Sequence, residues 1–277
     1  MDLRTALVQG TSLLEEARVP AARLTAEVLL CHALRCERTH LYCHPEDELS
    51  ELGWIHFGRY LHERMQGKPT QYITKRQEFF GRDFLVNPDV LIPRPETEHV
   101  VSAVLERVSP NSAVVDVGCG SGAIAITVAL ESRMHVFATD ISLAALRVAG
   151  TNAARLGAAN LQFACCDLLT AVAPNSVDIV VSNPPYVGLN EADGLQREVR
   201  QYEPHVALFA GETGMLLYQR LVEDAQRALR RGGWLVLELG WKSLEPVRAL
   251  FGHRWSEIAT VPDLAGIPRV LCARLAA

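Results

Sequence analysis

The sequence predicts a doubly wound, mostly parallel α/β sheet that follows a small helical N-terminal domain. From residue 113 onward, short apolar and β-branched segments alternate with helix-period segments, and a glycine-rich turn joins the first of these strands to its helix. Residues 2–68, by contrast, show only helical periodicity. Continuous apolar runs are typical of buried parallel strands, and their alternation with helices predicts βαβ units. We therefore expect a sheet whose ligand site lies at the carboxyl ends of its strands.

The N-terminal part, residues 1–70, is expected to form the helical domain. Apolar side chains recur at helical spacing along one face of its first segment, at Leu3, Leu7 and Leu14. The histidines of this part lack the spacing of a zinc site, and packed or solvated histidines are far commoner than metal ligands. We therefore expect no metal here.

Residues 71–92 change from helical to extended character and are expected to form a β-hairpin linker. The hairpin is predicted over Glu78–Val86, with its turn at Gly81–Asp83, because glycine and aspartate suit tight turns. The aromatic pair Phe79 and Phe80 is expected to belong to the core rather than to a ligand site.

The third part, residues 93–277, is expected to be the sheet domain and opens with a helix. Pro95 near the helix start and the acidic Glu96 and Glu98 in its first turn suit the helix dipole, so capping explains most of this segment. The alternative is that Arg94 contacts a carboxylate and pins the linker across the two domains.

The glycine-rich turn lies between the first strand of the sheet and its helix. The strand carries Asp116 and runs into Gly118, Gly120 and Gly122, and the helix begins at Ala123. Glycines let a ligand approach the backbone closely, and a helix N-terminus favours negative charge. The spacing differs from G-x-G-x-x-G, and Asp116 would repel a pyrophosphate. We expect the turn to receive the carboxylate of an amino-acid-like ligand, and Asp116 to accept from its ammonium group, directly or through water.

The next two strands each end in an acidic residue. His135–Asp140 ends in a carboxylate that is placed to accept from both hydroxyls of a ribose. Leu161–Cys166 leads to Asp167, which could read an adenine amino group while Leu168 packs on the ring. An adenosine joined to an amino acid satisfies these demands and those of the glycine turn.

The central strand of the sheet leads to Asn-Pro-Pro-Tyr. Val177–Val181 is apolar, and Asn183, Pro184, Pro185 and Tyr186 follow it at its carboxyl end. Prolines cannot donate, so the backbone there presents carbonyl oxygens, and the Asn183 amide adds an acceptor. Such a rigid edge suits a planar NH2 group, against which Tyr186 could stack. The alternative is a simple turn at the end of the strand.

These motifs together resemble the S-adenosylmethionine-dependent amino-methyltransferases with an NPPY motif and, within them, the protein-glutamine methyltransferases of peptide chain release factors. The resemblance is carried by Asp116–Gly122, Asn183–Tyr186 and Val90–Glu98, which reads VLIPRPETE, and it covers nearly the whole chain. It implies a seven-stranded class I methyltransferase fold with S-adenosylmethionine as methyl donor. It also implies a glutamine substrate in the Gly-Gly-Gln loop of release factors, recognised by the N-terminal domain. Lys75 departs from the family, which usually has glycine there.

The resemblance also implies the residues of the site. Substrate binding is expected at Asn183, Pro184, Pro185 and Tyr186, the first two being catalytic. The cofactor-binding residues are expected to be Asp116, Gly118, Cys119, Gly120, Ser121, Gly122, Asp140, Ile141, Asp167, Leu168 and Asn183.

A carboxamide nitrogen is a poor nucleophile because its lone pair is delocalised into the carbonyl. If Asn183 Oδ1 and the Pro184 carbonyl hold its two hydrogens, orientation and exclusion of water assist the transfer, by up to about 7–11 kcal/mol. We name no general base.

Two other functions stay open at this stage. The same Asn-Pro-Pro-Tyr edge could methylate an exocyclic amine of a flipped or single-stranded nucleic-acid base. A non-catalytic adenosyl-binding adaptor is the third possibility, against which the joint presence of Asp116, Asp140 and Asn183 argues.

The composition agrees with an enzyme of the cytoplasm. A net charge of -5 disfavours extended contact with nucleic acid, and 7 cysteines without C-x-x-C spacing disfavour disulfide frameworks and zinc sites. No signal peptide or membrane-spanning stretch is recognisable. We expect a monomer whose long, charged loop over residues 187–213 shapes the substrate entrance.

Overall fold

The computed structural model describes residues 1–276, which divide into two compact units. The first unit contains Met1–Arg76 together with Gln196–Tyr202, and the second contains Gln77–Leu195 and the chain from Glu203 onward. The β-hairpin thus falls within the second unit. The expected division at residues 70 and 92 into a recognition domain, a linker and a methyltransferase domain stays a prediction.

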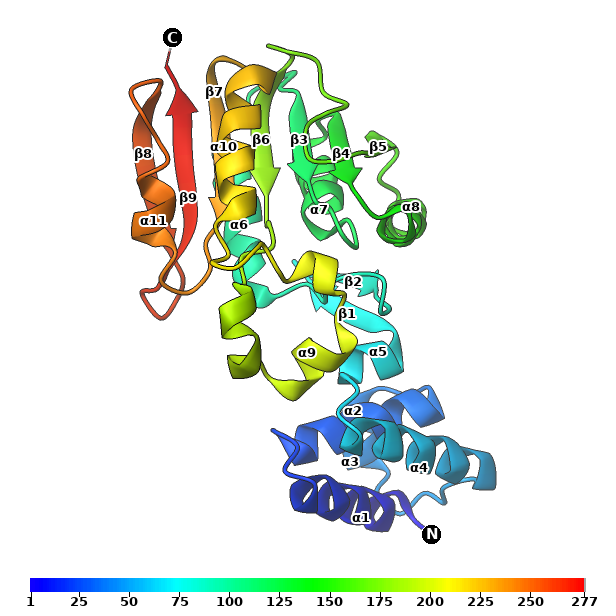
Figure 1. The fold of residues 1–277 in the computed structure, drawn as a ribbon. Helices are drawn as coiled ribbons and strands as arrows, with labels where there is room; N and C mark the ends of the chain where they lie inside the picture. The colour runs from blue at the N-terminus through cyan, green and yellow to red at the C-terminus, as the bar shows by residue number, and fades with distance from the viewer. Residues whose placement is uncertain (277) are drawn as a thin grey trace. The chain divides into compact units, whose positions relative to one another are not determined.

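The first unit is a bundle of helices (Figure 1). Its core is formed by fully buried side chains such as Leu14, Leu29 and Phe57, which come from the amphipathic faces of the longer helices. Side-chain caps set two of the helix starts, with Asp2 accepting from the backbone of Thr5 and Ser50 from that of Gly53. The helices are α1 (Leu3–Glu16), α2 (Ala22–Leu34), α3 (Arg38–Cys43), α4 (Glu51–Met65), α5 (Thr70–Thr74) and the later α9 (Arg197–Tyr202).

The helix α9 comes from the segment that was predicted as a long loop, and that prediction is wrong in detail. Residues 187–213 contain the turns η2 (Leu189–Gly194) and η3 (His205–Ala207) on either side of α9. Within the first unit, Glu198 of α9 forms an ion pair of 2.6 Å with the buried Arg64 of α4. Local helical turns satisfy the backbone of this charged segment, which has no apolar periodicity to signal them.

Lys75, the one departure from the family pattern, lies where the backbone is left-handed. Its φ is +61°, and its N–H donates to the carbonyl of Gln71 to end α5. Glycine adopts this conformation without steric cost, which explains the family's usual residue. The turn therefore keeps its geometry with a lysine in place.

The hairpin pairs β1 (Arg76–Phe79) with β2 (Arg82–Leu85). Its turn is formed by Phe80 and Gly81, both with positive φ of +51° and +71°, so the predicted turn at Gly81–Asp83 was one residue late. Two successive left-handed residues form the type of turn that matches the twist of a hairpin. Phe79 is fully buried and packs edge-on against Phe84, as predicted for the core.

The second unit contains a seven-stranded sheet in the order β5-β4-β3-β6-β7-β9-β8. All pairs are parallel except those of β9, which runs antiparallel to both β7 and β8. The predicted doubly wound sheet with an antiparallel pair at one edge is confirmed. Its strands are β3 (Val114–Val117), β4 (Val136–Asp140), β5 (Leu161–Cys165), β6 (Val177–Ser182), β7 (Leu229–Glu238), β8 (Trp255–Pro262) and β9 (Pro268–Leu275).

Helices cover both faces of this sheet. Figure 1 shows α10 (Leu216–Ala228) in front of β6 and β7, with α6 (Glu98–Leu105) and α7 (Ala123–Ser132) behind the strands. The face of α6 and α7 also carries α8 (Leu143–Leu156), and that of α10 carries α11 (Leu244–Arg248). Side chains alternate between the two faces.

This alternation decides which way the strand ends point. Ile179 and Val181 of β6 pack on the side of α6, and Val180 packs on the side of α10. Asn183 lies two residues after Val181 and so continues the same face of β6. Glu238 lies two residues after Val236 of β7, which also packs on the side of α6. Both polar side chains are therefore expected to face α6 and the turn η1 (Pro95–Thr97) before it.

All seven cysteines are free thiols. Within residues 1–276, every helix is too short or too polar to cross a membrane.

Candidate active site

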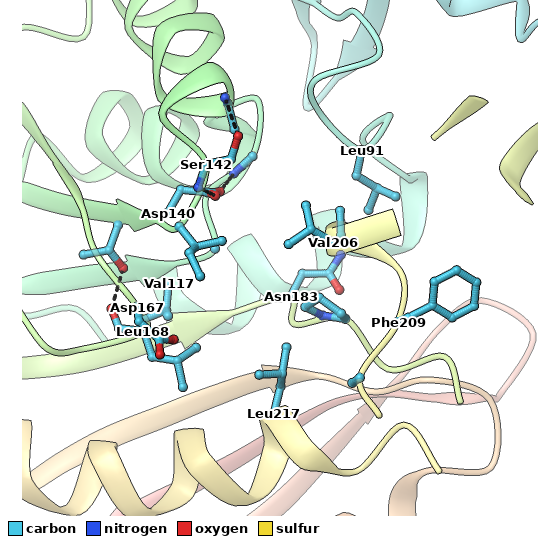
Figure 2. A pocket seen from close by; sticks show the side chains of 18 of the residues that line it. Leu91, Val117, Asp140, Ser142, Asp167, Leu168, Asn183, Val206, Phe209 and Leu217 are labelled. Atoms are coloured by element: carbon cyan, nitrogen blue, oxygen red, sulfur yellow. Dashed lines mark hydrogen bonds between the residues drawn. The ribbon is translucent and has the colours of Figure 1, made fainter. Parts of the chain in front are cut away.

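A cavity of about 310 Å³ lies at the carboxyl ends of the parallel strands in the second unit. A volume of this size suits a small-molecule ligand, and the position is the one predicted from the fold class. Figure 2 shows Asp140, Asp167, Leu168 and Asn183 around it. The predicted residues that line the cavity are Gly118, Gly120, Asp140, Ile141, Asp167, Leu168, Asn183 and Pro185. Those that do not line it are Asp116, Cys119, Ser121, Gly122, Pro184 and Tyr186.

The glycine turn is held against the end of β4. The N–H groups of Gly118 and Cys119 both donate to the carbonyl of Thr139, at 2.8 and 3.0 Å. Gly122 has a φ of +83°, and a Cβ there would lie 2.7 Å from Cδ1 of Ile126. The turn therefore requires glycine at Gly122 for both backbone conformation and space.

Asp116 lies behind the cavity rather than in its wall. The side chain is 1% exposed, and Oδ2 accepts from the N–H of Ala125 in the first turn of α7 at 3.0 Å. Oδ1 has no hydrogen-bond partner within residues 1–276, and burial raises the pKa of Asp116 to about 7. A buried acceptor without a donor fits an ammonium group reached through water, so this role stays a prediction.

Asp140 is fixed by two backbone donors at the edge of the cavity. Oδ2 accepts from the N–H of Gly120 at 2.9 Å, and Oδ1 accepts from the N–H of Ser142 at 2.8 Å. Figure 2 shows Asp140 beside Ser142, whose hydroxyl in turn caps α8. Each carboxylate oxygen can accept a second hydrogen bond, so both oxygens fit the hydroxyls of a ribose.

Asp167 has a partner that the sequence did not reveal. Its Oδ2 pairs with the guanidinium of Arg220 on α10 at 2.7 Å, and both side chains line the cavity. The other carboxylate oxygen is left for a ligand amino group. Leu168 lies next to it, with its carbonyl held by the hydroxyl of Thr139 at 3.0 Å.

At the end of β6, Asn183 contacts Thr97, the last residue of η1, in a way that orients the Asn183 amide. Its Nδ2 donates to the hydroxyl oxygen of Thr97 at 3.3 Å, which leaves Oδ1 as the free acceptor. Thr97 itself is 4% exposed. Pro185 lines the cavity and Pro184 is buried.

Tyr186 stands apart from the cavity wall. It is largely enclosed, and burial raises its pKa to about 12. Gly240 passes so close to its ring that a Cβ there would lie 2.6 Å from Cδ2. The expected stacking of Tyr186 on the substrate stays a prediction.

The backbone of Tyr186 is also approached closely by Gly214. A Cβ at Gly214 would lie 2.1 Å from the carbonyl oxygen of Tyr186, and the φ of Gly214 is +76°. The backbone of Gly214 therefore packs directly against the Asn183–Tyr186 segment. A larger residue at this position would force one of the two backbones to move.

We expect Gly214→Ala to displace this segment, lowering kcat at least about tenfold and the free energy of unfolding by about 1–3 kcal/mol. Gly252→Ala is the matched control, because a Cβ at Gly252 would meet no atom within 4 Å. Steady-state methyl transfer and thermal unfolding measure the two effects. Wild-type kcat in Gly214→Ala would contradict the requirement for close approach.

Arg94 contacts a carboxylate, as in the alternative considered from the sequence. Its guanidinium pairs with Oε1 of Glu203 at 2.5 Å, and the N–H of Ile92 donates to Oε2 of the same residue at 3.3 Å. Both partners belong to the second unit. The pair lies within the second unit, where it joins residues 92–97 to Glu203.

Several lining residues come from segments without a motif. They are apolar side chains of the stretch after the hairpin, of the segment around η3 and of α10: Val90, Leu91, Val206, Phe209, Leu216 and Leu217. Only the apolar face of α10 left a signal in the sequence, in its helical periodicity. Within residues 1–276, no group of three His, Cys, Asp or Glu side chains is arranged to hold a metal ion.

Models of two protein families match the chain. The PrmC N-terminal domain matches residues 5–74, and the methyltransferase small domain matches residues 97–199. The second match contains the glycine turn, both acidic strand ends and Asn183.

Solved structures support the fold alone. A methyltransferase from Pyrococcus furiosus has a TM-score of 0.53 at 19% identity and covers 71% of this chain and 89% of its own. The hMettl16 catalytic domain, solved in complex with the MAT2A 3'UTR hairpin 6, has a TM-score of 0.58 at 18% identity and covers 78% and 81%.

Curated relatives are far more similar. The release factor glutamine methyltransferase of Koribacter versatilis is 47% identical over 279 residues, which covers 99% of both chains. That of Bacillus subtilis is 40% identical over 259 residues and covers 90% of both. With the fold, the cavity and the Asn-Pro-Pro-Tyr segment in agreement, this chain belongs to the release factor glutamine methyltransferase family.

Proposed function

We propose that the protein transfers a methyl group from S-adenosylmethionine to the side-chain amide nitrogen of a glutamine in the Gly-Gly-Gln loop of a peptide chain release factor. The observation that carries this proposal is the orientation of Asn183, whose Nδ2 is engaged by Thr97 while Oδ1 is left to accept. Relatives that cover 90–99% of this chain are named release factor glutamine methyltransferases.

The residues in and around the cavity support S-adenosylmethionine as its ligand. Asp140 offers two fixed acceptors for the ribose, Asp167 and Leu168 suit the adenine, and the glycine turn offers backbone for the amino-acid part. The unpartnered Oδ1 of Asp116 adds an acceptor on the ammonium side. When bound, S-adenosylmethionine supplies a methyl group activated by a positively charged sulfur.

The chain's own contribution is to hold the glutamine amide. Asn183 Oδ1 and the carbonyl of Pro184 accept the two hydrogens of the NH2 group, so that the face of the nitrogen points at the methyl carbon. The apolar wall formed by Leu91, Phe209 and Leu217 excludes water. The carbonyl dipoles stabilise the positive charge that develops on the nitrogen, and the proton leaves after transfer.

Methylation of a nucleic-acid base amine is not favoured, since the full-length relatives are named for glutamine. We propose that the first unit recognises the release factor, that the enzyme acts as a monomer without direct contact to nucleic acid, and that it works in the cytoplasm, where its substrate takes part in translation. Size-exclusion chromatography with light scattering tests the monomer.

The function is tested with labelled S-adenosylmethionine, a purified release factor and unmethylated nucleic acid. We expect label on the release factor alone, located by peptide mass spectrometry on the glutamine of the Gly-Gly-Gln loop. A release factor with that glutamine changed to asparagine or alanine should remain unlabelled. Label on the nucleic acid, or on another residue of the factor, would contradict the proposal.

A further inference from the structure

Glu238 is a buried acid next to the reacting edge that no motif of the sequence marks. It ends β7, the strand beside β6, and the pairing of Ser182 with Leu237 brings Asn183 and Glu238 to the same level of the sheet. The Glu238 side chain is 3% exposed, and its Oε2 has no hydrogen-bond partner within residues 1–276. Burying a carboxylate without a full set of hydrogen-bond partners is costly, and this cost makes Glu238 a candidate for a role in the site.

Glu238 is connected to Asn183 through one hydroxyl group. The Thr97 oxygen accepts from Nδ2 of Asn183 at 3.3 Å, and the Thr97 hydroxyl lowers the pKa of the Glu238 carboxyl group, as a donor beside a carboxylate does. The alternation along β6 and β7 directs Asn183 and Glu238 to the α6 side of the sheet, where Val181 and Val236 pack.

The direction of these hydrogen bonds follows from counting protons. An ionised carboxylate can only accept, and a threonine hydroxyl has a single proton to donate. With that proton directed to Glu238, Thr97 accepts from Asn183, which is the direction found in the structure. The Asn183 amide must then turn Nδ2 to Thr97 and Oδ1 to the cavity.

We propose that Glu238 is a positioning residue which, through Thr97, fixes the flip of the Asn183 carboxamide so that its oxygen faces the NH2 group of the substrate. This inference rests on the proposed function, because only an NH2-bearing substrate needs the oxygen. If the Asn183 amide were flipped, its NH2 group would face the NH2 group of the glutamine. Both groups are donors, so no hydrogen bond could form between them.

The charge state of Glu238 decides whether the flip is fixed. Burial raises the pKa of Glu238 to about 7, although the Thr97 hydroxyl and the positive charge of Arg269 each lower it. The other charged or titratable groups that interact with it are Glu96, Arg94, Tyr186 and Tyr218. Below this pKa the carboxylic acid can donate to Thr97, whose proton is then free to bind Oδ1 of Asn183 instead. The fixed flip is therefore present above about pH 7 and lost as the pH falls.

The first test compares Thr97→Val with Thr97→Ser. Loss of the hydroxyl is expected to lower kcat about 10- to 100-fold at pH 8 while the cofactor Kd stays within about threefold of wild type. Serine keeps the hydroxyl and should restore kcat to within about fivefold of wild type. Thermal unfolding shows whether each variant is folded. A folded Thr97→Val with wild-type kcat would overturn the inference.

The second test uses Glu238→Gln, which keeps an acceptor for Thr97 but cannot ionise. At saturating cofactor, wild-type kcat is expected to fall between pH 8 and pH 6, and the fall should be smaller in Glu238→Gln. The comparison between the two proteins removes the contribution of Asp116, whose pKa is also about 7. Identical pH profiles would overturn the inference, whereas absence of methylation by the wild type at every pH would instead count against the proposed function.

Discussion

Replacing Asn183 with alanine is expected to lower kcat for methylation of the release factor about a thousandfold, with little change in the affinity for S-adenosylmethionine. The side chain offers the acceptor that orients the glutamine NH2 group, and orientation together with preorganised dipoles accounts for effects of about this size. The Asn183 amide is one of many groups around the cofactor cavity, so most cofactor contacts survive.

Single-turnover methylation and calorimetric titration with S-adenosylhomocysteine separate the two effects. Asn190→Ala is a suitable control, because Asn190 is an exposed asparagine of η2 outside the cavity wall. The assigned role would be wrong if Asn183→Ala weakened cofactor binding as much as it slowed transfer.

Asp140→Ala is expected to have the opposite signature, with cofactor Kd raised about 100-fold and kcat at saturating cofactor changed much less. Two hydrogen bonds from ribose hydroxyls to a carboxylate are lost, each of about 1.5 kcal/mol. The N–H groups of Gly120 and Ser142 also lose their acceptor, which loosens the turn.

Calorimetry measures the Asp140 effect, and Asp140→Asn provides a graded comparison, since asparagine keeps one acceptor oxygen. We expect its Kd to lie between those of wild type and Asp140→Ala. If Asp140→Ala bound the cofactor nearly as tightly as the wild type, Asp140 would not be the residue that binds the ribose.

The strand ends were the most predictable part of the molecule. Asp140 and Asn183 follow apolar runs that are typical of buried strands, Asp167 follows the partly exposed edge strand β5, and parallel strands bring their carboxyl ends to one edge. Their meeting around one cavity therefore followed from strand type and order. The glycine turn was predictable because the backbone at Gly118, Gly120 and Gly122 is left-handed, a conformation that glycine adopts without steric cost.

The partners of these residues were not predictable from the sequence. Thr97 lies 86 positions from Asn183, and Arg220 lies 53 positions from Asp167. Such contacts depend on how α6 and α10 are placed on the sheet, which local periodicity does not determine. The hairpin turn was misplaced because Phe80, a bulky residue, adopts a positive φ that sequence preferences assign to glycine or asparagine.

The ion pair of Glu198 with Arg64 has a consequence for how this protein can be divided. Because α9 belongs to the first unit although it comes from the middle of the second, the helical unit is built from two separate stretches of chain. A fragment that starts at residue 77 would carry an orphaned helix, and one that stops at residue 76 would leave a buried guanidinium without its counter-ion. Exchange of the helical unit between relatives would therefore require a paired transplant of residues 1–76 and 196–202.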